Sequence, residues 1–164
     1  MINAKLTEPS KIRHKGEFYN HSPAVDVRSS VGDDVWNQYF TFSMERHPYE
    51  KVISHVFYHA RNKENWDFEK ELKRVFKKGY YISYPIYSDG EDPIVDFIVN
   101  YERLQEDLSV LSDKLGFDVS AHYPQTKHTH RPGRKPARDL LSDEHKDLIY
   151  ERCKIEFETL GFER

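Results

Sequence analysis

One short segment constrains the fold more than any other, because it joins a strand pattern directly to a helix pattern. Residues 40–44 alternate apolar and polar side chains, which is the period of a strand with one buried face. Pro48 then opens a stretch whose apolar residues fall on one face of a helix that extends to Ala60. A strand followed directly by an amphipathic helix is typical of α/β proteins, so the pattern predicts a layered α/β fold with a mainly parallel sheet.

The rest of the chain continues this alternation of strands and helices. Residues 94–101 predict a second strand, and residues 80–87 predict a weaker, aromatic one that Pro85 interrupts. Helices are expected from Ser22 to Ser30, Pro48 to Ala60, Asp67 to Lys78, Glu102 to Leu115 and Ser142 to Gly161, with a short helical turn at Trp36. Two good strands are fewer than a doubly wound sheet usually contains.

Length and composition fit one folded domain. The chain has 164 residues, and its 14% aromatic content argues against disorder although 32% of the residues are charged. We expect a single domain over residues 1–164, with an irregular lead-in at 1–20 and a basic loop at 118–138. The single cysteine, Cys153, cannot form an internal disulfide and gives no sign of an oxidising compartment.

Charge and hydropathy restrict the partners. The formal net charge of −3 does not favour nucleic acid or an anionic membrane as a partner. No run of about 18 apolar residues predicts a membrane span, and the N-terminus lacks a secretory core. We therefore expect a cytoplasmic protein.

The corner between the first strand and its helix has the features of an anion site. In open α/β sheets, ligands bind beyond the carboxyl ends of the strands, and a helix N-terminus there offers N–H groups and partial positive charge. Arg46 adds a planar guanidinium suited to phosphate, and Ser54 lies two turns into the helix, off its apolar stripe. The alternative is an arginine that binds a nearby carbonyl and a solvated serine.

The same segment resembles a motif of a known enzyme family. Residues 46–54 read Arg-His-Pro-Tyr-Glu-Lys-Val-Ile-Ser. This is similar to the 3′-phosphate-binding motif of carbohydrate-type sulfotransferases that use PAPS (3′-phosphoadenosine 5′-phosphosulfate), Arg-(Asn/Asp/His)-Pro-(aromatic)-(Asp/Glu)-Arg-(Val/Leu)-(Val/Ile)-Ser. The main departure is Lys51, which keeps the positive charge but not the guanidinium fork. The resemblance implies that Arg46 and Ser54 bind the 3′-phosphate of PAPS.

Two further stretches, residues 97–107 and 139–162, are similar to the family's next strand-to-helix segment and to its closing helix. The resemblance therefore covers roughly residues 17–164. It implies a P-loop-NTPase-like sulfotransferase fold, with a mainly parallel sheet flanked by helices. It also implies transfer of a sulfuryl group from PAPS to a hydroxyl of a carbohydrate or small acceptor, without a metal.

Histidine is the side chain best suited to remove the acceptor's proton near neutral pH. His21 precedes a predicted helix, and the family's glycan-modifying members resemble this chain in carrying an aromatic residue and a histidine upstream of the Arg-x-Pro strand. His21 is thus the candidate general base, and the alternative is a surface histidine at a helix end. His55 and His59 have a spacing that can bind zinc, but no further ligand follows at a suitable distance, so no metal site is predicted.

Residues 119–138 contain no acidic side chain. Their basic residues are Lys127, Arg131, Arg134, Lys135 and Arg138. Such a loop in an acidic protein favours an anionic ligand, and the resemblance places this region over the donor, with Lys127 and Arg138 as candidate contacts. The alternatives are a solvated loop and a DNA-binding hook, although the order Pro-Gly-Arg at 132–134 departs from the hook's core.

One part of the family pattern has no counterpart here. The family begins with a strand and a loop of the form Lys-(Thr/Ser)-(Gly/Ala)-(Ser/Thr)-(Ser/Thr), which binds the 5′-phosphosulfate, and nothing in residues 1–40 matches it. We therefore expect an N-terminally incomplete fold, from a truncated gene or fragment, or else a diverged loop supplied elsewhere or by another chain. Its unpaired sheet edge would favour self-association. The alternative function is a non-catalytic remnant that binds adenosine 3′,5′-bisphosphate or a partner chain.

Overall fold

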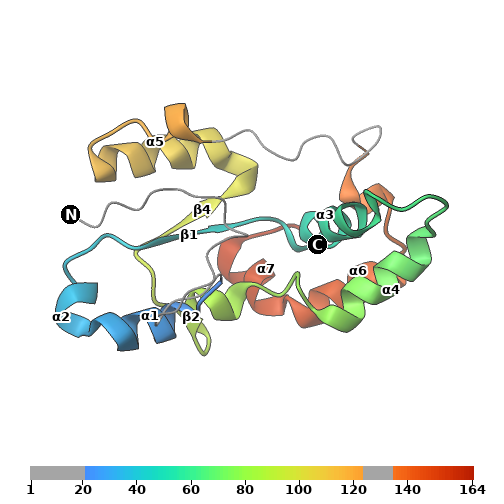
Figure 1. Ribbon diagram of the computed structural model, residues 1–164, viewed down its shortest axis with the longest axis horizontal. Helices are drawn as coiled ribbons and strands as arrows, with labels where there is room; N and C mark the ends of the chain where they lie inside the picture. The colour runs from blue at the N-terminus through green and yellow to red at the C-terminus, as the bar shows by residue number, and fades with distance from the viewer. Residues whose placement is uncertain (1–20, 124–134) are drawn as a thin grey trace.

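The structure, a computed structural model, describes residues 21–123 and 135–164. Its centre is a parallel pair of strands, β1 (Phe42–Glu45) and β4 (Phe97–Asn100), in which Phe42 lies opposite Phe97 (Figure 1). Helix α5 (Leu104–Leu115) lies on one side of this pair, and α1 (Ala24–Val31) and α2 (Asp33–Trp36) lie on the other. The predicted α/β architecture with a parallel sheet is thus confirmed at this level.

Most of the helices gather beyond the carboxyl end of β1. They are α3 (Pro48–Ala60), α4 (Phe68–Lys78), α6 (Asp143–Arg152) and α7 (Lys154–Leu160). Short 3-10 turns lie at η2 (Tyr84–Ile86), before a small antiparallel hairpin of β2 (Ser88–Asp89) and β3 (Asp92–Pro93), and at η6 (Ala137–Asp139), before α6. Two more, η3 (Tyr101–Arg103) and η4 (Ser120–His122), lie before and after α5. This helical half holds the carboxyl end of β1 in place.

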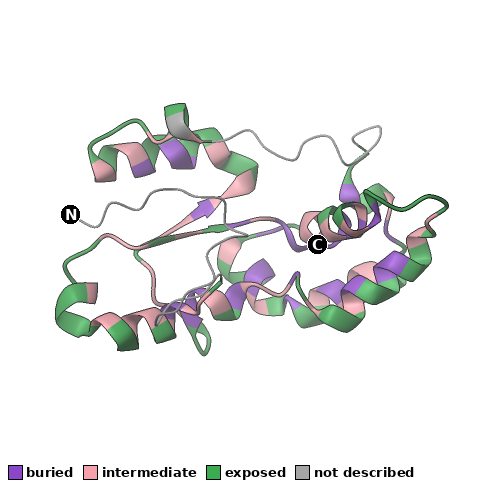
Figure 2. Ribbon diagram, viewed as in Figure 1, coloured by how far each residue is buried: buried purple, intermediate pink, exposed green. Residues whose placement is uncertain are grey.

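The main hydrophobic core lies inside this helical half. The apolar stripe of α3 is buried as its spacing predicts, with Val52, Ile53 and Val56 fully enclosed. They pack in one cluster with buried residues of α4, α6 and α7, including Leu72, Val75, Ile149 and Phe157 (Figure 2). A second, smaller cluster joins β4 to α5 through Val99, Leu108 and Leu111.

Local capping signals predict several helix ends correctly. Asp67 caps α4, its Oδ1 accepting a hydrogen bond of 2.8 Å from the backbone N–H of Lys70. Ser142 caps α6 in the same way. At the other end of α4, Gly79 has a φ of 67°, a left-handed conformation that glycine adopts without steric cost.

Replacement of Asp67 by alanine should lower the free energy of unfolding by about 1 kcal/mol, because the N–H of Lys70 loses its acceptor at the start of α4. Urea unfolding followed by circular dichroism measures this loss. Asp67→Asn is the matched control, since asparagine keeps an acceptor oxygen at the cap and should retain most of the stability. Equal losses in the two variants would contradict the capping role.

The strand expected at residues 80–87 is wrong. The segment instead turns after Gly79 and forms η2, because its backbone donors are taken by a side chain rather than by a neighbouring strand. Ser83 N–H and Tyr84 N–H both donate to Oε1 of Glu156, at 3.1 and 3.0 Å. Pro85 has no N–H to offer a ladder.

Three helix boundaries also differ from the prediction. The expected helix from Ser142 to Gly161 is two helices, α6 and α7, separated at Cys153. Ile149, Cys153 and Phe157 are buried in one cluster on both sides of this break. Near the N-terminal end, α1 begins after Pro23 without a side-chain cap, and the helix expected from Glu102 begins as the 3-10 turn η3 before α5.

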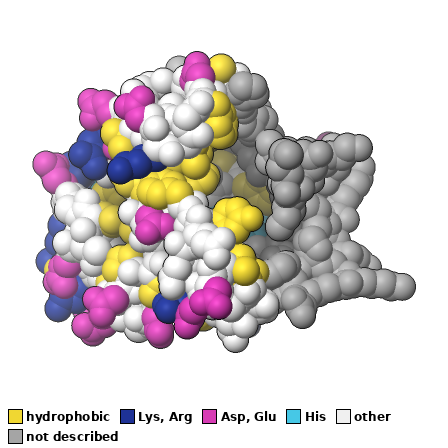
Figure 3. Space-filling view, turned by 90° about the vertical axis from the view of Figure 1, so that its left-hand side faces the viewer, with side chains coloured by type: hydrophobic (Ala, Val, Ile, Leu, Met, Phe, Trp, Pro, Cys, Tyr) yellow, Lys and Arg dark blue, Asp and Glu magenta, His cyan; other side chains and the backbone are white. Residues whose placement is uncertain are grey.

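One end of the molecule exposes apolar side chains. Val35 of α2 is 43% exposed, and Tyr39 and Phe42, at the start of β1, are 62% and 47% exposed. Figure 3 shows apolar side chains gathered among charged groups on this side of the molecule. Within the described residues, β1 pairs with β4 alone, so the self-association predicted for an unpaired sheet edge stays a prediction for this surface.

Candidate functional site

The candidate site is built where β1 gives way to α3. β1 ends at Glu45, and His47 caps α3, its Nδ1 accepting from the N–H of Tyr49 at 3.2 Å. The other ring nitrogen, Nε2, lies 2.8 Å from the carbonyl oxygen of Glu163. These two contacts require the tautomer with its hydrogen on Nε2. His47 therefore ties the start of α3 to the C-terminal segment.

Arg46 lies at this corner with its side chain 34% exposed. Its Nη2 donates to Oε2 of Glu50 at 3.0 Å, and its guanidinium lies over the ring of Tyr101, 4.9 Å from the ring centroid. Ser54 is an exposed residue of the same helix. Glu50 and Ser54 are four residues apart in α3, so they lie on one side of its start, and Arg46 precedes the helix.

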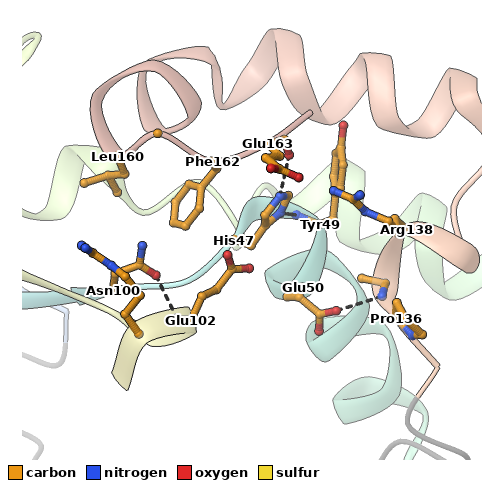
Figure 4. A pocket seen from close by; sticks show the side chains of 13 residues that line it. His47, Tyr49, Glu50, Asn100, Glu102, Pro136, Arg138, Leu160, Phe162 and Glu163 are labelled. Carbon is orange, nitrogen blue, oxygen red and sulfur yellow. Dashed lines mark hydrogen bonds between the residues drawn. The ribbon is translucent and has the colours of Figure 1, made fainter. Parts of the chain in front are cut away.

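A cavity of about 640 Å³ opens beside this corner (Figure 4). It is lined by His47, Tyr49, Glu50, Asn100, Glu102, Arg103, Pro136, Ala137, Arg138, Leu160, Gly161, Phe162 and Glu163. Most of its lining is polar, and both arginines and carboxylates face it, so it suits a ligand that is itself polar or charged. It lies at the carboxyl end of β4, where α/β sheets usually bind ligands.

Glu50 connects Arg46 to the wall of this cavity. While Oε2 pairs with Arg46, Oε1 accepts a hydrogen bond of 2.8 Å from the backbone N–H of Ala137 in η6. Arg138 is the next residue after Ala137, and its positive charge acts on the hydroxyl of Tyr49, a residue that is 2% exposed. Burial raises the pKa of the Tyr49 hydroxyl, and the charges of Arg164 and Arg138 oppose that rise.

The predicted site residues are only partly brought together. Arg46 and Arg138 are linked through Glu50 and Ala137, whereas neither Arg46, Ser54 nor His21 lines the cavity described above. Lys127 lies outside the described residues. The ligand contacts expected for these residues stay predictions.

His21 is exposed and adopts a left-handed backbone conformation with a φ of 62°. Its electrostatic influence reaches His55 on α3. Burial is the main cause that lowers the pKa of His55, followed by the neighbouring His59, and burial also lowers the pKa of His59. The charge of His21 is the smallest of the contributions that lower the pKa of His55.

The rings of His55 and His59 stack with their centroids 6.2 Å apart. Among residues 21–123 and 135–164, no group of three or more histidine, cysteine, aspartate or glutamate side chains is arranged to hold a metal ion. None of the described helices is long and apolar enough to cross a membrane.

The structure also contains a buried network of charged side chains beneath the corner, which the sequence patterns do not predict. Nζ of Lys51 lies 2.9 Å from Oε1 of Glu45 and 2.8 Å from Oε2 of Glu156, and it also donates to Ser83. Oε1 of Glu45 in turn accepts the backbone N–H of Arg46 at 2.8 Å. The network therefore fixes the backbone from which the Arg46 side chain extends.

Only some of these contacts can be predicted from the sequence. The spacing of Arg46 and Glu50 is that of a helical ion pair, so their contact is detectable from the sequence. Glu156 is different, because it lies 105 residues from Lys51 and reads as one more charge on a polar helix.

Comparison with known proteins gives one match of sequence. No family model matches the chain, and no solved structure matches it. A protein of Archaeoglobus fulgidus, described only as an uncharacterized protein, is 35% identical over 101 residues, which cover 57% of this chain and 82% of that protein. The chain therefore belongs to the same family as this uncharacterized archaeal protein.

Proposed function

We propose that this protein is a sulfotransferase-type protein that binds the 3′-phosphate of PAPS at the Arg46 corner. The observation that carries the proposal is the position of Arg46, which follows a parallel strand and precedes the N-terminus of a long helix. Guanidinium hydrogen bonds and the helix dipole both favour a phosphate there. The finer assignment, a P-loop-NTPase-like sulfotransferase fold, is part of this proposal and rests on the resemblance of residues 46–54.

In the proposed reaction, an acceptor hydroxyl of a carbohydrate or small molecule attacks the sulfur of PAPS. A new S–O bond forms, and the bond from sulfur to the bridging phosphate oxygen breaks. The electron pair stays on the leaving phosphate of adenosine 3′,5′-bisphosphate, and the acceptor's proton passes to a general base. His21 is the proposed base, and Arg46, Ser54, Lys127 and Arg138 are the proposed donor contacts.

A second candidate function is binding of adenosine 3′,5′-bisphosphate, or of a partner chain, without turnover. It is favoured by one observation, that residues 1–40 contain no counterpart of the family's 5′-phosphosulfate loop. Without a lysine and backbone N–H groups around the leaving oxygen, the transition state would lose much of its electrostatic stabilisation.

Calorimetric titration with adenosine 3′,5′-bisphosphate tests the nucleotide binding that both candidate functions include. The wild type should bind saturably, and Arg46→Ala should bind at least about tenfold more weakly, because it loses charge-assisted hydrogen bonds to the phosphate. Arg61→Ala is the matched control, since Arg61 lies over Tyr58 at the far end of α3. Adenosine 5′-monophosphate, which lacks the 3′-phosphate, should bind weakly to every variant.

The absence of nucleotide binding by folded wild-type protein would overturn the proposal. Equal affinities of wild type and Arg46→Ala would show that the nucleotide binds elsewhere on the molecule. If the nucleotide binds, sulfuryl transfer from PAPS to glycans then separates the enzyme from the non-catalytic alternative. His21→Ala should reduce turnover without changing nucleotide affinity.

A further inference from the structure

The anion-binding arginine already has an anion in contact with it. Arg46 donates to Glu50 at 3.0 Å, and both side chains are partly buried, 34% and 23% exposed. The positive charge that would attract a phosphate is therefore balanced by a carboxylate in the first turn of α3. Since the two charges cancel, the remaining attraction for an incoming anion comes mainly from the helix N-terminus and from cations farther away.

Glu50 is also held from its other side. Its Oε1 accepts the N–H of Ala137, so one carboxylate bridges the guanidinium at the strand end and the turn η6 that carries Arg138. A carboxylate with hydrogen bonds to both of its oxygens is kept in position rather than swinging into solvent. An anion that approaches Arg46 must therefore displace this carboxylate or bind close to its charge.

We propose that Glu50 is a built-in competitor that limits the affinity of the Arg46 site for anions. This inference rests on the proposed function, because it concerns the same phosphate site. A phosphate group and a carboxylate beside one guanidinium repel each other, and the repulsion is stronger at a partly buried site than in water. The consequence is a nucleotide that binds weakly enough to be released readily.

The decisive variant is Glu50→Gln, which removes the negative charge but keeps an oxygen that can accept the N–H of Ala137. Its affinity for adenosine 3′,5′-bisphosphate in calorimetry should exceed that of the wild type by about threefold or more, as expected for loss of one ion pair and its repulsion. Glu102→Gln is the matched control, since Glu102 is a carboxylate of the same cavity without an ion pair to Arg46 among the described contacts. It should change the affinity much less.

Inorganic pyrophosphate serves as a second probe that lacks the nucleoside. Tighter pyrophosphate binding by Glu50→Gln, without nucleotide binding by any variant, would support the competitor and overturn the nucleotide assignment. Nucleotide binding that requires Arg46 but does not improve in Glu50→Gln would overturn the competitor and keep the proposed function. An equal gain in Glu102→Gln would also overturn it, because the effect would then be one of general charge. Binding of neither probe to any variant overturns both proposals.

A measurement on the wild type covers the case in which Glu50→Gln does not fold. During titration with pyrophosphate, the backbone amide signal of Ala137 in ¹⁵N–¹H spectra should shift, because Glu50 loses Arg46 and changes its bond to that amide. The shift should be absent in Arg46→Ala. An Ala137 signal that stays unmoved while wild-type protein saturates would overturn the competitor.

Discussion

Replacement of Lys51 by methionine should lower the free energy of unfolding by about 3–5 kcal/mol, the largest loss expected for any single charged residue described here. The Lys51 ammonium lies between Glu45 and Glu156, whose side chains are each 1% exposed. Methionine fills a similar volume but leaves both carboxylates buried without a counter-charge. Urea unfolding monitored by fluorescence measures the loss.

Lys70→Met is the control for this substitution, because Lys70 is exposed on α4, and it should change stability by no more than about 0.5 kcal/mol. A second variant sharpens the test. Adding Glu156→Gln to Lys51→Met removes one of the two buried charges, so the pair should cost less than the sum of the two single substitutions. Strict additivity would show that the network contributes little as a unit.

Phe157→Ala should lower the free energy of unfolding by about 3–5 kcal/mol, for a different reason. The ring is 3% exposed and packs against aromatic residues from three parts of the chain. Its centroid lies 5.4 Å from those of His47 and Tyr49, 5.3 Å from that of Tyr150 and 6.5 Å from that of Phe162. Truncation leaves a cavity that these rigid rings cannot fill, and chemical unfolding measures the cost.

The matched control is Phe117→Ala, since Phe117 follows α5 and is 56% exposed. Removal of this ring should change stability by about 0.5 kcal/mol or less, because little buried surface is lost. Similar losses for the two variants would contradict the role assigned to Phe157. A specific loss for Phe157→Ala should also weaken nucleotide binding, since the ring supports His47 at the start of α3.

The strand-to-helix corner is the part of the candidate site that sequence patterns predict best. Proline at the first helical position and the apolar stripe of α3 act over a few residues, and the structure has both of them. The alternation before Arg46 gives the strand β1, but not the buried apolar face, because Phe42 and Met44 are exposed and Glu45 is buried. The third strand is predicted wrongly because residues 80–87 have strand-like composition. Their backbone N–H groups instead meet Glu156, a partner that lies more than 70 residues away.

The sequence by itself determines the local structure of this protein. Asp67 and Ser142 start helices, and Gly79 and Gly116 end them with φ values of 67° and 73°, because capping and left-handed turns depend on neighbours within one turn of the chain. The spacing of apolar residues likewise determines which face of a helix is buried, as in α3.

Only the tertiary structure decides how the charges at the corner are paired. Glu50 meets Ala137 across 87 residues, and Lys51 meets Glu156 across 105. Such contacts depend on how the helices pack, and a charged residue has the same local pattern whether its partner is water or a buried ion. The packing of α3, α7 and η6 therefore decides that Arg46 has a carboxylate beside it and that its backbone is held by a buried network.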